Sequence, residues 1–256
     1  MTLAGLTAED LMTPLFNEET MKLNKYVAHS GVCSRRKAAE LVKQGKITVN
    51  GEVMRQPFYE VAESDKVLYQ GKMLVPQKDF IYLLMNKSKN LITTLQDEKG
   101  RKTVMDIIKP EHKKNRIFPV GRLDRNTTGL LLLTNDGQLA DKLTHPRNEV
   151  KKIYHAVLNK PMTDQDLEKI KNGLQLEDGP IRVDKIARLE GQPETEIGVE
   201  IHSGRNRIVR RIFEHLGYEV LRLDRVYFAG LTKKDIPRGR YRVLTEKEIR
   251  LLKHFS

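Results

Sequence analysis

Asp124 is the residue whose surroundings first suggest chemistry. It lies between Arg122 and Arg125, in a stretch that follows an apolar run ending at Val120 and precedes a second apolar run, residues 130–133. The pattern predicts a strand, an exposed loop and a buried strand. A carboxylate on a loop held between core strands has a firm mount and access to solvent. Spacing alone leaves two interpretations open: a catalytic carboxylate, or a loop ion pair in which the arginines only balance its charge.

A cluster of arginines follows a Ser-Gly pair further along the chain, with no acidic residue before Glu214. Its members are Arg205, Arg207, Arg210 and Arg211. Ile208, Ile212 and Leu216 recur every four residues, which predicts a helix with these side chains on its buried face. The last three arginines then share the opposite face. Such a row of guanidinium groups suits phosphate binding, whereas the plainer alternative is a solvated helix face.

Tyr154 is the third candidate. It lies in residues 151–158, which alternate in the manner of a half-buried strand. A tyrosine on a strand packs in a core more often than it lines a site, so Tyr154 points to function only in combination with other residues.

The remaining pattern predicts the elements that would hold these candidates. The expected strands are residues 80–87, 196–201, 220–223 and 226–228. The expected helices are residues 104–108, which stop before Pro110, a helix begun by Asp136-Gly137, one capped by Thr163 and ended by Gly173, and a last one capped by Thr245 with Glu248.

The composition points to a polyanionic partner. The chain has 256 residues and a formal net charge of +12, and solubility alone does not require so large an excess of one sign. No apolar run approaches the roughly 18 residues needed to cross a bilayer, and no basic and apolar leader begins the chain, so a cytosolic location is expected. One cysteine and seven histidines without ligand spacing predict no metal site.

The first part of the chain divides by charge. Residues 1–20 contain four acids and no Lys or Arg, and we interpret them as a separate acidic arm. Residues 22–46 contain seven basic side chains against one acid, Glu40, and predict two short helices, the second capped by Ser34 and ended near Gly45. The dipeptide Asn50-Gly51 between alternating residues predicts a β-hairpin.

Residues 22 to about 75 resemble an S4 RNA-binding domain, because Ser34-Arg35-Arg36 and Val49-Asn50-Gly51 both fall at the expected spacing. We therefore expect an S4 domain over residues 21–75 and a linker over residues 76–79. The resemblance implies RNA and not a membrane as the partner. The RNA contacts that it implies are Lys25, Arg35, Arg36, Lys37, Lys46 and Asn50.

Together with this module, three separated motifs resemble the bacterial pseudouridine synthases of ribosomal RNA. The group that they resemble comprises the small-subunit enzymes of type A and the large-subunit enzymes of types B, E and F. The motifs are Gly121-Arg122-Leu123-Asp124, Lys152-Ile153-Tyr154, and Gly204-Arg205-Asn206-Arg207 with Val209-Arg210-Arg211. The resemblance implies that Asp124 is the catalytic aspartate, that Tyr154 lies beside the target base and that Arg210 pairs with Asp124. Further RNA contacts are expected from Arg122, Arg205, Asn206, Arg207 and Arg211. Thr128 and Ile208 depart from the group, which often has Glu and Gln there.

The resemblance implies an α+β protein in which residues 80–256 form a catalytic domain with a central mixed, mostly antiparallel sheet flanked by helices. Isomerisation of uridine involves no redox change, so no cofactor is expected. The predicted function is conversion of a uridine of ribosomal RNA, free or in an assembly intermediate, to pseudouridine by a monomeric enzyme. Residues 173–179 favour type B of the large-subunit enzymes, whereas the N-terminal motif is closer to type F. The alternatives are a small-subunit enzyme and a non-catalytic S4 protein of ribosome assembly. A nuclease is disfavoured because the sequence offers no His pair or carboxylate cluster.

Overall fold

The computed structural model describes residues 20–77 and 79–254. The expected acidic arm, apart from Thr20, lies outside the described residues. The chain divides between Lys78 and Asp79 into two compact units, and this division falls inside the expected linker. Within the described ranges, no helix combines the length and the apolar character that crossing a membrane would require.

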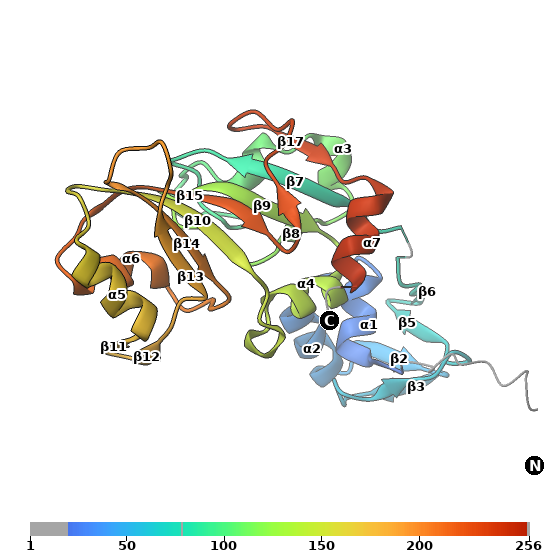
Figure 1. Cartoon of the computed structure of the whole chain (residues 1–256). Coiled ribbons are helices and arrows are strands. Elements are labelled where there is room, and N and C mark those ends of the chain that lie inside the picture. The colour runs from blue at the N-terminus through green and yellow to red at the C-terminus, as the bar shows by residue number, and fades with distance from the viewer. Residues whose placement is uncertain (1–19, 78, 255–256) are drawn as a thin grey trace, which may run out of the picture. The chain divides into compact units, whose positions relative to one another are not determined.

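The first unit consists of two helices and short strands (Figure 1). Its elements are β1 (Met21–Lys22), α1 (Leu23–His29), α2 (Arg35–Lys43), β2 (Ile47–Val49), β3 (Glu52–Met54), β4 (Glu60–Val61), β5 (Val67–Tyr69) and β6 (Lys72–Met73). Strands β3, β2, β5 and β6 form one sheet in that order, and β1 pairs with β4. Leu23, Val27, Ala38, Val42 and Ile47 are fully buried and join the helices to this sheet in one core.

The local signals of the first unit are confirmed. Ser34 is the N-cap of α2, and its side chain accepts a hydrogen bond from the backbone N of Lys37. Asn50 and Gly51 have φ values of 53° and 90° between β2 and β3, as a tight turn with two left-handed residues requires. The first turn of α2 therefore presents its basic residues from a fixed position.

The second unit is built on one large sheet. Its strands are β7 (Tyr82–Lys87), β8 (Phe118–Pro119), β9 (Thr128–Thr134), β10 (Lys152–Leu158), β11 (Leu174–Leu176), β12 (Gly179–Ile181), β13 (Lys185–Arg188), β14 (Glu196–Ile201), β15 (Val220–Phe228), β16 (Leu231–Thr232) and β17 (Tyr241–Val243). Its helices are η1 (Val104–Ile107) and η2 (Pro146–Asn148), both 3₁₀, and α3 (Pro110–Lys113), α4 (Gly137–Thr144), α5 (Asp164–Asn172), α6 (Ile208–His215) and α7 (Glu246–His254).

The order β13-β14-β10-β15-β9-β7-β17 runs across this sheet, with β8 and β16 pairing off it. Neighbours along this order are antiparallel except β15 and β9, which are parallel over two residue pairs. The expected α+β class with a mixed, mostly antiparallel sheet is confirmed. The parallel seam joins two halves of the sheet, and Figure 1 shows β9 and β15 side by side there.

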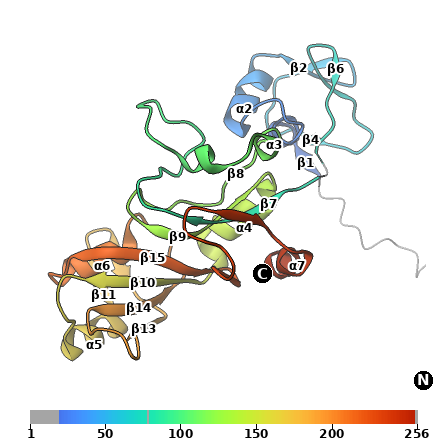
Figure 2. The same cartoon turned by 90° about the horizontal axis from the view of Figure 1, so that it is seen from above.

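Each half has its own covering. Helices α5 and α6 pack on the half that contains β10, β13, β14 and β15 (Figure 2), around Ile197, Val199, Ile212 and Phe213. On the other half, Leu130 and Leu132 face α4 and α7, while Leu131 and Leu133 face a second core with Val104 and Ile108. The run of four leucines is therefore buried on both faces, which explains why it does not alternate.

A glycine makes the seam possible. Gly129 has a φ of +105° and pairs with Arg225 across the two strands. A Cβ at this position would lie 2.2 Å from the Arg225 carbonyl oxygen and 2.6 Å from its nitrogen, closer than atoms in contact can approach. The end of the Asp124 loop is consequently joined directly to β15.

One expectation about the strands was wrong. The two strands expected at residues 220–223 and 226–228 are one strand, β15. The charged residues between the two segments suggested a break in the strand. The strand continues through them because Asp224 accepts hydrogen bonds from Thr128, Lys233 and Arg238. The short helix expected at residues 104–108 is confirmed as a 3₁₀ helix over Val104–Ile107, and Pro110 begins a further helix, α3, as proline at the first helical position can.

Candidate active site

The loop that carries Asp124 is anchored at both ends. Val120 and Leu123 are buried, and the backbone N of Val120 donates to the Leu132 carbonyl at 2.8 Å. The side chain of Thr93 donates to the Leu123 carbonyl at 2.8 Å, and the Thr127 N donates to the Asp124 carbonyl at 3.0 Å. The Asp124 carboxylate remains 36% exposed. A fixed backbone with an accessible carboxylate is what a catalytic acid or nucleophile requires.

A buried lysine, Lys87, holds the backbone of this loop. Its side chain has no solvent exposure, and its Nζ donates to the carbonyls of Asp124 at 3.0 Å, Arg125 at 3.3 Å and Thr127 at 2.8 Å. A fourth contact, at 3.1 Å, goes to the Ser88 carbonyl. Burial lowers the pKa of Lys87 to about 8, although the nearby Asp124 opposes this shift. Lys87 thus fixes the loop through its backbone.

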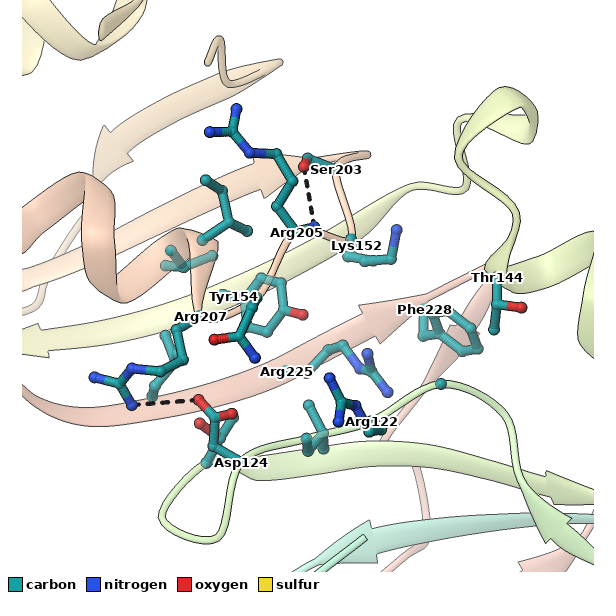
Figure 3. Close-up of a pocket in the computed structure, with 18 of the residues that line it drawn as sticks. Arg122, Asp124, Thr144, Lys152, Tyr154, Ser203, Arg205, Arg207, Arg225 and Phe228 are labelled. Atoms are coloured by element: carbon teal, nitrogen blue, oxygen red, sulfur yellow. Dashed lines mark hydrogen bonds and ion pairs between the residues drawn. The ribbon is translucent and has the colours of Figure 1, made fainter. Parts of the chain in front are cut away.

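Tyr154 lies on the neighbouring half of the sheet. It pairs with Val199 of β14 on one side and with Arg225 of β15 on the other. Its ring is half-buried against the hydrophobic cores of both halves of the sheet. Figure 3 shows the ring between the Asp124 loop and the segment before α6. It therefore offers an aromatic surface beside the carboxylate.

Arg207 is the ion-pair partner of Asp124. Its Nη1 lies 3.6 Å from Asp124 Oδ2, and its Nη2 also lies 3.1 Å from Glu214. Arg207 directly precedes α6 in a left-handed conformation, with a φ of 48°, which turns it toward the loop (Figure 3). The expectation that Arg210 makes this ion pair was wrong: within the described residues, the contact of Asp124 is with Arg207.

Arg210 lies elsewhere than expected on α6. It is only 8% exposed and donates from Nη1 to the Val220 carbonyl at 2.7 Å, so it does not share the open face with Arg207 and Arg211. Burial and then Arg207 lower its pKa, while Asp124 opposes that shift. Arg210 therefore acts on Asp124 through its charge and not through a direct contact.

Arg205 and Arg211, both expected to contact RNA, bind the same carboxylate of this chain. Asp178, in the turn between β11 and β12, accepts hydrogen bonds from Arg205 Nε at 3.0 Å and Arg211 Nη1 at 2.9 Å, and each second nitrogen also contacts it. Arg205 also donates to the Pro180 carbonyl at 2.8 Å. The hairpin thus holds the loop that leads to Arg207, while Asn206 in that loop stays exposed.

These parts enclose a pocket of about 240 Å³. Its walls come from the Asp124 loop, β10, the loop before α6, and β15, with Arg122 and Asn206 among the lining residues. Asp124 is the only carboxylate in this lining, within the ranges that the structure describes. The two other cations that line it, Lys152 and Arg225, were not recognised as site residues from the sequence, although Lys152 belongs to the motif that drew attention to Tyr154 (Figure 3).

The expected RNA contacts of the first unit lie mostly at its surface. Arg35, Arg36 and Lys37 are exposed in the first turn of α2, and Lys46 is exposed just before β2. Lys25 is half-buried. Asn50 is exposed, but its side chain bonds Asp65 at 2.7 Å and the backbone N of Lys66 at 2.9 Å. Its amide therefore supports the fold of the hairpin.

A single carboxylate, an aromatic ring and several guanidinium groups in one pocket, on a chain with a second basic unit, are the features of an RNA-modifying enzyme. Residues 81–215 match the family model of RNA pseudouridylate synthases, and residues 21–67 match that of S4 domains. The chain is 42% identical to ribosomal large subunit pseudouridine synthase B of Bacillus subtilis (strain 168), over 91% of this chain and 95% of that protein. It is 32% identical to the dual-specificity RNA pseudouridine synthase RluF of Salmonella typhi, over 92% of this chain and 79% of that protein.

A crystal structure of a pseudouridylate synthase superposes with a TM-score of 0.66 at 25% identity, over 91% of this chain and all of that one. The chain belongs to the RNA pseudouridylate synthase family. It is an isomerase that acts on RNA, with an S4 domain ahead of its catalytic domain.

Proposed function

We propose that the protein converts a specific uridine of large-subunit ribosomal RNA to pseudouridine, with Asp124 as the catalytic residue. The observation that carries the assignment of Asp124 is that no other carboxylate lines the pocket within the described residues. The large-subunit substrate is supported by the name of the Bacillus subtilis relative, which aligns over 91% of this chain. We expect a monomer acting in the cytosol, on free ribosomal RNA or an assembly intermediate.

The reaction is an isomerisation within one nucleotide. The bond from ribose C1′ to uracil N1 breaks, the base turns, and a bond from C1′ to C5 forms, while C5 loses a proton and N1 gains one. No oxidant, reductant or water enters the balance. One carboxylate near the ribose can serve this chemistry. Hydrolysis of a glycoside uses two: one protonates the leaving group, and the other activates water or attacks the sugar.

The other residues have distinct roles in this proposal. Tyr154 provides a surface against which the flipped-out uracil stacks, which excludes water while the base is detached. Arg207 orients the carboxylate through the ion pair at 3.6 Å, and Arg210 adds a buried positive charge behind it. Arg122 and Asn206 contact the RNA at the pocket rim, and the exposed residues of α2 contact phosphates.

The test is a map of pseudouridines in the ribosomal RNA of a strain that lacks the gene. We expect one or more large-subunit positions to lose the modification, wild type to restore them, and Asp124→Asn not to. Glu190→Gln, an exposed carboxylate outside the pocket lining, is the matched control and should restore them fully. Full restoration by Asp124→Asn would show that the catalytic assignment is wrong.

If only small-subunit positions lost the modification, the substrate would be small-subunit ribosomal RNA and the proposed large-subunit substrate would be wrong. The remaining alternative, a non-catalytic assembly protein, predicts no change in the map and no release of tritium from RNA labelled at uridine C5. Tritium release by the purified protein would exclude it.

A further inference from the structure

Lys152 and Arg225, two pocket cations withdrawn from solvent, have no carboxylate partner. Among the described residues, Lys152 and Arg225 make no ion pair within 4.0 Å. Lys152 Nζ donates only to the carbonyls of Val150 at 2.8 Å and His202 at 2.6 Å. Arg225 is 3% exposed, its Nε donates to the Leu130 carbonyl at 2.8 Å, and its buried Nη2 has no hydrogen-bond partner. Buried charge without a counter-ion is costly, which indicates an anionic ligand.

The strand register brings the two cations together. Lys152 and Tyr154 alternate on β10 and so share a face, and Arg225 pairs with Tyr154 from β15. The Arg225 guanidinium lies 4.6 Å from the centre of the Phe228 ring, which holds it in place. Burial, and then the charge of Arg225, lower the pKa of Lys152 to about 8, an effect that Asp184 opposes. The strand register and the shared lining therefore place both cations on one wall of the pocket.

Two other arginines of the pocket are neutralised within the protein: Arg207 pairs with Asp124 and Glu214, and Arg205 pairs with Asp178. Arg122 makes no ion pair among the described residues either, but it is exposed to solvent, where an unpaired charge costs little. The unpaired charges withdrawn from solvent are thus those of Lys152 and Arg225. Figure 3 shows these two side chains toward Phe228 and Thr144, on the other side of Tyr154 from Arg207.

We propose that Lys152 and Arg225 form a phosphate subsite that binds a phosphodiester flanking the target uridine. This inference rests on the proposed function, because it takes the substrate to be an RNA whose uridine lies between Asp124 and Tyr154. The subsite fixes the direction in which the nucleotide enters: ribose and base toward Asp124, phosphate toward β15. It also makes Lys152 and Arg225 binding residues for the reacting nucleotide, separate from the S4 contacts.

The experiment uses the full-length protein and a short oligoribonucleotide spanning the uridine identified by the pseudouridine map. Three versions are compared: all phosphodiesters, a neutral methylphosphonate at the linkage 5′ of the uridine, and one at the linkage 3′ of it. Affinity and turnover are measured for wild type and Lys152→Met. We expect one neutral linkage to weaken binding to wild type about tenfold or more, as the loss of a charge-assisted contact does. In Lys152→Met, where Arg225 alone still contacts the phosphate, the same linkage should weaken binding at least about threefold less than it does in wild type.

Lys151→Met is the matched control. Lys151 pairs with Glu200 at 2.8 Å and does not line the pocket, so its variant should lose as much affinity as wild type on the neutral linkage. Lys152→Arg should restore the sensitivity. Arg225→Gln gives a second measurement, made after its thermal unfolding confirms a folded protein. Equal losses for wild type and Lys152→Met, or no loss with either neutral linkage in wild type, would overturn the subsite. Absence of turnover by wild type on every RNA would instead contradict the proposed function.

Discussion

Substitution of Lys87 by methionine should change how stability depends on pH. Lys87 is fully buried, and its Nζ donates to four backbone carbonyls, three of them in the loop that carries Asp124. Methionine has a similar length and no charge. The substitution therefore removes one titrating group from beneath the loop with little change in packing volume.

The magnitude follows from the pKa of Lys87, which burial lowers from 10.5 to about 8. Above pH 8 the folded state releases this proton while the unfolded state still holds it, so the free energy of unfolding rises with pH until about pH 10.5 and the gain is absent below pH 8. Between pH 7 and pH 9.5 the contribution of Lys87 amounts to about 2 kcal/mol. Lys87→Met lacks it, so the stability difference between wild type and variant should grow in favour of wild type by that amount.

The assay is urea unfolding followed by far-ultraviolet circular dichroism at half-unit steps from pH 7 to pH 9.5. Lys152, whose pKa is also lowered to about 8, is present in both proteins, and its contribution cancels in the comparison. Lys89→Met is the control, since Lys89 is exposed and should leave the pH dependence of wild type unchanged. A constant difference between wild type and Lys87→Met would refute the reasoning, because it would mean that the four carbonyls hold the ammonium form as well as water does.

Three further outcomes are expected. Gly129→Ala should lower the free energy of unfolding by about 3–5 kcal/mol, through a strained φ and a clash with β15, and a loss below 1 kcal/mol in urea unfolding would contradict the described seam. Asp178→Asn should lower kcat about tenfold with little effect on KM, because the loop before α6 loses its anchor. The control Glu177→Gln, at the exposed neighbouring residue, should leave kcat and KM unchanged. A lower KM with an unchanged kcat would indicate that Asp178 only competes with RNA for the arginines. Arg35→Ala combined with Arg36→Ala should weaken RNA binding and reduce its salt dependence, and an unchanged salt slope would remove α2 from the phosphate contacts.

Local signals predicted the elements of this fold well, because they depend on neighbours in sequence. Ser34 caps α2, Thr163 caps α5, and the Asn-Gly turn of the first unit forms where expected. The residues that complete the pocket depend on contacts between distant strands. In the sequence, Lys87 is the polar end of an apolar strand, and Arg225 lies between two segments that were expected to be separate strands. The sequence does not indicate that Lys87 contacts the loop of Asp124 or that Arg225 lies beside Tyr154.

The position of Arg210 shows how a correct period can still give a wrong face. Ile208 and Ile212 recur every four residues, but Val209 and Phe213 are buried as well. At about 100° per residue, these two additional side chains rotate the centre of the apolar face toward Arg210, so that Arg210 lies at its border and not opposite to it. From there its long side chain reaches the Val220 carbonyl. Arg207 makes the contact with Asp124 instead, because it precedes the helix and its direction is not set by the helical repeat. The residue that lies outside the regular element is thus the one free to turn toward the carboxylate, while the buried arginine supplies charge from a fixed place.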